Sequence, residues 1–208
     1  MDLGADDVQP IKVDSLHAKA SPMPNGAGEA FQTEMQRAAT YLVPKRGTYD
    51  LGDLVDRANE TFSPEVRGVI GAVANEEYVN AGRCFAFGLF TASGYHCCRA
   101  VEAVLREYFR LFTGKAIKGT EQWGEMIGGL EKCSGSLIPE PKTLGHIRHV
   151  KDFDRNPLSH VRAVLDETDA DILLAASKVA ITAMAAEIHK KHLTGAPVLE
   201  LVKADGSA

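Results

Sequence analysis

The stretch EYVNAGRCFAFGLFTASGYHCCRAVEAVLREYFRLF, residues 77–112, decides the fold class. Its first part is an apolar-rich helix that Gly88 ends or kinks. Thr91 or Ser93 can cap a second long helix, and Gly114 ends it. The second helix carries a wide apolar stripe at helical spacing, made of Tyr95, Cys98, Val101, Leu105, Tyr108, Phe109 and Phe112. This stretch therefore predicts two consecutive long helices that contribute to one core.

The rest of the chain shows the same periodicity, and strand signals are nearly absent. Further helices are expected over 29–42, 49–62, 120–132, 142–153 and 168–193, with a boundary or a new helix start at Ser63-Pro64. The sequence predicts an all-α, up-down helical bundle. We expect a loose leader over 1–28, a helical extension over 29–66, the main helical domain over 67–193 and a tail over 194–208.

Composition narrows the functional class. The 208 residues are 45% hydrophobic, which suits one core with an appendage, and no run approaches the roughly 20 apolar residues of a membrane span. The acidic beginning lacks the apolar region of a secretory signal. Four cysteines without a CxxC pair predict reduced thiols and a cytoplasmic location. The net charge of −5 argues against broad, non-specific adhesion to nucleic acid.

The segment RNPLSH, residues 155–160, carries the most chemistry. Asn156 suits an N-cap and Pro157 the first helical position, but a helix start requires neither Arg155 nor His160. The free N–H groups of such a helix start, a guanidinium and an imidazole together form a plausible phosphate site. The alternative is a plain helix start, in which Arg155 pairs with a neighbouring aspartate and His160 packs half-buried.

The same segment resembles the R-x4-6-H signature of the HEPN superfamily. The similarity extends back to the two long helices, which carry an A-x-x-C-x-x-x-G run and an H-x-x-R-x-x-E-x-x-L-R run. The motif follows about fifty residues downstream and precedes the last long helix, as it does in that family. The resemblance covers roughly residues 70–192 and leaves residues 1–65 outside it.

The resemblance implies a metal-independent RNA endonuclease without a cofactor, with a cleft formed by two protomers of a homodimer. Arg155 and His160 would be the catalytic pair, and Asn156 would be the polar member of the motif. The products would carry a 2′,3′-cyclic phosphate and a 5′-hydroxyl, in a toxin or phage-defence setting with a cognate antitoxin or regulatory protein. Two alternatives stay open: a non-catalytic module that binds RNA, a nucleotide or a protein, and a purely structural helical dimer.

Several other residues have a functional and a structural interpretation. Arg99, Glu102 and Arg106 share one helix face; Glu102 could orient His160, or it could simply pair with Arg106. A satisfied helix histidine is the preferred interpretation of His96. The remaining candidates are interpreted structurally: the His146 and His149 pair lacks the further ligands of a metal site, whereas Cys97, Cys98 and Trp123 are expected in the core.

Overall fold

The computed structural model describes residues 43, 45–117, 122–135, 138–155 and 164–194, and gives the backbone alone for 153–155. The chain divides into two units, residues 1–42 and 43–208. The fold described below is that of the second unit. The predicted helix over 29–42 and the predicted leader over 1–28 lie outside the described residues.

Every regular element in the described part of the chain is helical, so the all-α prediction is confirmed. In chain order the elements are α2 (Leu51–Asp56), η3 (Ala58–Thr61), α3 (Pro64–Ala86), α4 (Phe90–Thr113), α5 (Trp123–Glu131), α6 (Pro141–His149), η4 (Val150–Arg155) and α8 (Glu167–Leu193). The turns η3 and η4 are a 3-10 helix and a π-helix. The predicted boundary between residues 66 and 67 falls inside α3.

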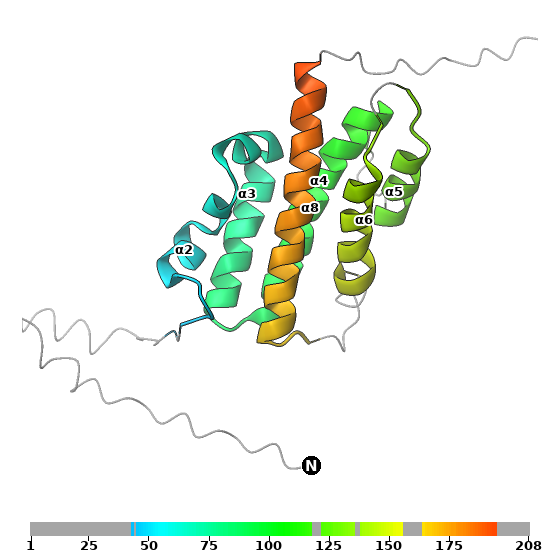
Figure 1. Cartoon of the computed structure of the whole chain (residues 1–208). Coiled ribbons are helices and arrows are strands. Elements are labelled where there is room, and N and C mark those ends of the chain that lie inside the picture. Colours follow the sequence, from blue (N-terminus) through cyan, green and yellow to red (C-terminus); the bar gives the residue numbers. More distant parts are fainter. Residues whose placement is uncertain (1–42, 44, 118–121, 136–137, 156–163, 195–208) are drawn as a thin grey trace, which may run out of the picture. The chain divides into compact units, whose positions relative to one another are not determined.

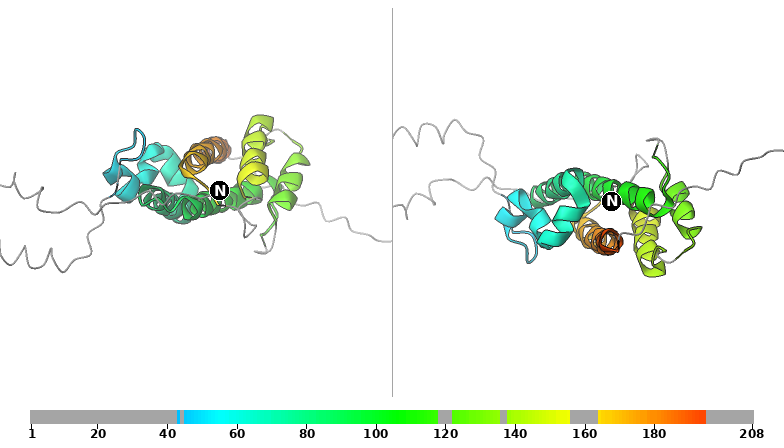
Figure 2. Two further views of the ribbon diagram at one scale, coloured as in Figure 1. Left: turned by 90° about the horizontal axis from the view of Figure 1, so that it is seen from below. Right: turned by 90° about the horizontal axis from the view of Figure 1, so that it is seen from above.

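The centre of the bundle is α4, which packs against α3, α5 and α8. Figures 1 and 2 show α8 lying across the α3–α4 pair, with α2 and η3 beside α3 at one edge and α5 and α6 at the other. Two buried hydroxyls tie α8 to this pair: Tyr78 donates to the Leu174 carbonyl at 3.0 Å, and Tyr108 donates to Glu187 at 2.8 Å. The two long helices of residues 77–112 therefore form the scaffold on which the other elements pack.

Helix α3 begins at Ser63-Pro64, one of the two outcomes predicted there, and thus earlier than the apolar pattern alone indicates. Ser63 caps it by accepting from the Val66 N–H at 3.3 Å, and Pro64 takes the first helical position. Gly71 interrupts the helix with φ of +78°, a conformation that favours glycine. The Asn75 side-chain amide donates to the Gly71 carbonyl at 2.8 Å, which satisfies a backbone group at the break. The interruption explains why the sequence pattern becomes regular only near residue 75.

The predicted cap of α4 is wrong. The N-cap is Leu89, which makes no side-chain capping bond. Ser93 instead donates to the Ala81 carbonyl at 2.8 Å, and Thr91 accepts from the Leu165 N–H at 3.0 Å. These hydroxyls are used in contacts with other segments, which sequence spacing does not reveal. The predicted end at Gly114 is confirmed, with φ of +67° in the left-handed region.

Helix α8 carries apolar residues on nearly all of its faces. Among the described helices, it alone has the length and apolar content to cross a membrane, and 50% of its most apolar window is buried inside the chain. Core helices of water-soluble proteins share this property, and α8 packs against α3, α4 and α6 as such a helix does. Asp166 caps its start by accepting from the Asp169 N–H at 2.8 Å.

Candidate functional site

The predicted catalytic segment lies at the border of the described structure. Arg155 is the last residue of η4, and only its backbone is described; Asn156 and His160 lie outside the described residues. The turn η4 continues α6 and packs against both α4 and α8. Whether Arg155 and His160 share a groove is therefore still a prediction, but the element that delivers the motif has a defined place beside α4.

Glu102, predicted to support the site, bonds to two helices. Its Oε1 accepts from Arg106 Nε at 3.1 Å and from the terminal nitrogen at 2.7 Å, so the predicted i, i+4 pair is confirmed. Its Oε2 accepts from Trp123 Nε1 at 2.9 Å. Trp123 is 1% exposed, as the prediction of a core tryptophan requires. The carboxylate thereby connects α4 to the start of α5.

Lys151 shows how close η4 lies to this carboxylate. A Cβ added at Gly124 would lie 3.7 Å from Lys151 Cε, so the lysine stem rests on the first turn of α5. Trp123, the neighbour of Gly124, is the residue that donates to Glu102. Lys151, near the start of η4, and Glu102 therefore both contact the first turn of α5.

A hollow of about 270 Å³ lies between α5 and the α6–η4 segment. Its polar lining consists of two ion pairs, Arg148 with Glu131 and Lys151 with Asp152, the second at 2.5 Å. Two cations therefore face two carboxylates, and the hollow carries no surplus of positive charge. Gly124 and Gly128 line the hollow on its α5 side, where they have no side chains to fill it.

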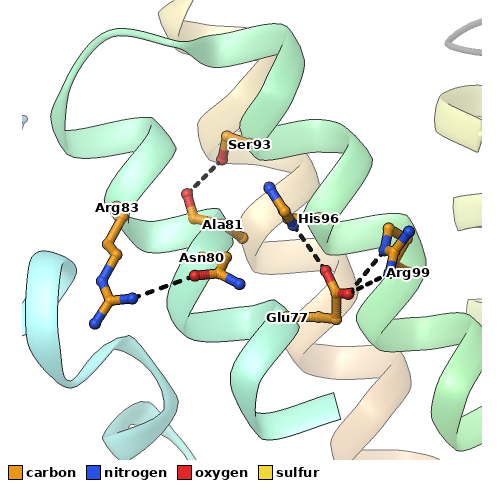
Figure 3. A network of polar contacts seen from close by, with 7 residues as sticks. All are labelled: Glu77, Asn80, Ala81, Arg83, Ser93, His96 and Arg99. Atoms are coloured by element: carbon orange, nitrogen blue, oxygen red, sulfur yellow. Dashed lines mark hydrogen bonds and ion pairs between the residues drawn. The ribbon is translucent and has the colours of Figure 1, made fainter. Parts of the chain in front are cut away.

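A second polar cluster lies on the α3–α4 pair (Figure 3). Glu77 of α3 extends toward α4, where its Oε2 contacts His96 Nδ1 at 2.7 Å. Its Oε1 accepts from Arg99 Nε at 2.8 Å and from a terminal nitrogen of Arg99 at 2.7 Å. We call these three residues the Glu77 cluster. It confirms that His96 has a hydrogen-bond partner, and it gives Arg99 a partner that the sequence analysis did not identify.

Electrostatics keep the carboxylate of the Glu77 cluster ionised. Burial would raise the pKa of Glu77, but hydrogen bonds from Arg99 and His96 outweigh it and the pKa is lowered. An ionised carboxylate is only an acceptor, so the Nδ1 atom of His96 carries the proton and Nε2 faces away from Glu77. The Glu77 side chain is 11% exposed, that of His96 32% and that of Arg99 68%. The carboxylate of Glu77 is therefore buried, whereas the side chains of His96 and Arg99 reach water.

Glu77 is the polar residue that the sequence analysis missed. It lies at helical spacing with Ala74, Tyr78, Ala81 and Phe85, all of which are buried. A charged residue within a buried helical face is unusual unless it has a partner. That position in the apolar pattern was the available signal, although the identity of the partners depends on how α3 and α4 pack.

Other candidates stay structural. Cys97 and Cys98 are buried, as predicted. His146 lines a hollow of about 410 Å³ between α6 and α8, together with Lys142, Lys190 and the apolar side of α8. Over the residues that the structure describes, no group of three or more His, Cys, Asp or Glu side chains is placed to hold a metal ion.

Comparison with known proteins adds no relative. No protein-family model matches the chain, and neither a curated protein nor a solved structure matches it. The resemblance to the HEPN superfamily therefore depends on the motifs quoted above.

Proposed function

We propose that this protein is a metal-independent RNA endonuclease whose active site is completed at a homodimer interface. Arg155 and His160 are its catalytic pair, and Asn156 is the polar residue of the motif. Glu102 and Arg99 support it from α4. The expected setting is cytoplasmic, as a toxin or phage-defence ribonuclease controlled by an antitoxin or a regulatory protein.

The observation that carries the proposal is the place of η4. This turn packs against α4, and Lys151 near its start contacts the first turn of α5, where Trp123 donates to Glu102. Its π-helical form also supports a functional role, since π-helical turns occur frequently at functional sites. A segment that served only as a helix start would need neither the π-helical turn η4 nor the nearby carboxylate of Glu102.

The chemistry follows from the residue types. RNA carries its own nucleophile, the 2′-hydroxyl, and a neutral His160 takes its proton. The 2′-oxygen then attacks the adjacent phosphorus, and the bond to the 5′-oxygen breaks. The guanidinium of Arg155 stabilises the charge that develops on the phosphorus oxygens. A protonated histidine from the partner protomer donates to the leaving 5′-oxygen, which leaves a 2′,3′-cyclic phosphate and a 5′-hydroxyl.

A second candidate is a HEPN-like module that binds RNA, a nucleotide or a protein without cleaving it. One observation favours it. All three arginines of α4 are paired with carboxylates: Arg99 with Glu77, Arg106 with Glu102 and Arg110 with Glu107. Paired arginines and a net charge of −5 suit a selective binder better than a general RNA-degrading enzyme.

Two substitutions separate these functions. His160→Ala and Arg155→Ala should each lower the rate of RNA cleavage by about 10²–10⁴-fold, because each removes a group that acts in the transition state. Asn156→Ala is the matched control in the same motif: it removes a cap and should cost about 1 kcal/mol of stability with a milder loss of rate. Cleavage at the wild-type rate by both the His160 and Arg155 variants would favour the binding module.

A further inference from the structure

The Glu77 cluster directs hydrogen-bond donors toward solvent. Both oxygens of Glu77 are occupied by His96 and Arg99. Arg99 carries five N–H donors, and the bonds to Glu77 use Nε and one terminal nitrogen. Across the described ranges, no acceptor is found for the other terminal nitrogen of Arg99 and no partner for His96 Nε2, which donates only when the ring is protonated. The free donors belong to side chains that are 68% and 32% exposed, so a ligand in water can reach them.

The stability of the fold alone does not explain why Glu77 is buried between His96 and Arg99. Removing a carboxylate from water has a large cost, and a buried ion pair usually stabilises a fold no better than apolar residues of similar size. The other two arginine–carboxylate pairs of α4 lie within that one helix, and their carboxylates, Glu102 and Glu107, are 30% and 40% exposed. Glu77 differs because it is buried, comes from another helix and fixes two cationic or cation-forming groups at once.

We infer that His96 and Arg99, held in place by Glu77, bind a phosphate group on the outer side of α3 and α4. The fork of a guanidinium matches phosphate oxygens, and a protonated imidazole adds a second charged donor. The negative charge of Glu77 is buried, whereas the guanidinium of Arg99 reaches water. Arg99 is also a supporting residue of the proposed RNA site, but phosphate binding at the Glu77 cluster needs neither Arg155 nor His160 and no RNA cleavage.

Asn80 extends the polar face of the site. It lies one helical turn beyond Glu77 on α3, and Figure 3 shows it on the side of α3 that faces His96. Arg83 donates to Asn80 Oδ1 at 3.3 Å, which leaves the amide nitrogen of Asn80 as a further donor. The ligand is thus a phosphate contacted mainly by N–H groups, either free or as part of a nucleotide or an RNA backbone.

The test is a titration of the full chain followed by the side-chain nitrogen resonances of its histidines. Inorganic phosphate, a ribonucleoside 5′-monophosphate and a single-stranded oligoribonucleotide are added in separate arms, with acetate as the carboxylate control. We expect a saturable shift of His96 Nε2 with the phosphate compounds and none with acetate over the same range. An oligoribonucleotide that binds at least about tenfold more tightly than phosphate would identify the RNA backbone as the source. Equal affinities would identify a small phosphate compound.

Variants connect the shift to the named residues. Arg99→Gln and His96→Gln should weaken phosphate binding by at least about tenfold, because each removes a charge-assisted hydrogen bond. Arg110→Gln is the matched control, since Arg110 lies on the same helix, is 52% exposed and pairs with Glu107. Its affinity should equal that of the wild type.

Three results would overturn the inference: no saturable shift in the wild-type protein, an equal response to acetate, or an equal loss of affinity in Arg110→Gln. The wild-type titration needs no substitution, so a variant that fails to fold leaves the test intact. Failure of RNA cleavage would not affect this result, because Arg155 and His160 take no part in it.

Discussion

Glu77 and Glu102 are two glutamates that each hold an arginine of α4, yet they occupy opposite environments. Glu77 comes from α3, is buried, and divides its oxygens between Arg99 and His96. Glu102 belongs to α4 itself, is 30% exposed, and bonds to Arg106 one turn away and to Trp123 of α5. One carboxylate joins α3 to α4, and the other joins α4 to α5.

The difference separates local from tertiary information. The pair of Glu102 and Arg106 follows from an i, i+4 spacing within one helix, so sequence alone predicts it. The bonds of Glu77 exist only because α3 and α4 pack in one particular register. The comparison also concerns two proposed roles: Glu102 supports the proposed RNA site, and the Glu77 cluster is the proposed phosphate site, with Arg99 common to both.

The largest expected effect on stability comes from Trp123, the α5 residue that donates to Glu102. Trp123→Ala should lower the free energy of unfolding by about 3–5 kcal/mol, because it empties a fully buried aromatic position. Urea denaturation followed by circular dichroism measures this. Trp123→Phe keeps most of the packing and loses the donor to Glu102, so it should cost less. A loss below about 1 kcal/mol in Trp123→Ala would contradict the buried position.

The two carboxylates should differ when each is removed. Glu77→Ala should lower the free energy of unfolding by about 2 kcal/mol, because it leaves a cavity and removes the charge-assisted hydrogen bonds to His96 and Arg99. Glu102→Ala should cost about 1 kcal/mol, since the site is half-open and water can replace the carboxylate. The same denaturation measurement compares them. Equal losses would show that the burial of Glu77 has no energetic consequence.

A smaller effect should appear as a dependence on pH. The pKa of Glu77 is lowered in the folded chain, so its ionised form stabilises the fold above its ordinary value of 4.5, and this contribution is lost as the pH falls. Glu77→Gln cannot lose a charge. The stability difference between the wild type and Glu77→Gln should therefore decrease from about pH 7 to about pH 3. A constant difference across this range would mean that folding does not lower the pKa of Glu77.

Sequence reasoning was most successful where the signals are local. The all-α class and the end of α4 at Gly114 both follow from periodicity and helix-terminal chemistry. It was wrong about the cap of α4, because Ser93 and Thr91 bond to other segments, which spacing within a single helix does not show. Glu77 was missed for the same reason.

The residues of the predicted RNA site also differ in how far the sequence could predict their positions. Glu102 and Arg99 could be placed on one face of α4 from their spacing, and the structure confirms their location on that helix. The additional bond from Trp123 to Glu102 depends on the packing of α5 and was not predictable. Arg155 and His160 came from a short motif and a resemblance, and the roles assigned to them stay predictions.

Analysis of cleaved RNA ends tests the central claim most directly. The purified protein is incubated with mixed RNA in excess EDTA, and the ends are identified by their reactivity toward phosphatase and kinase, with the His160→Ala variant in parallel. We predict cleavage by the wild type that leaves 2′,3′-cyclic phosphate and 5′-hydroxyl ends, and a loss of about 10²–10⁴-fold in the variant. Intact RNA after incubation with the wild type, or equal cleavage by both proteins, would contradict the proposed endonuclease.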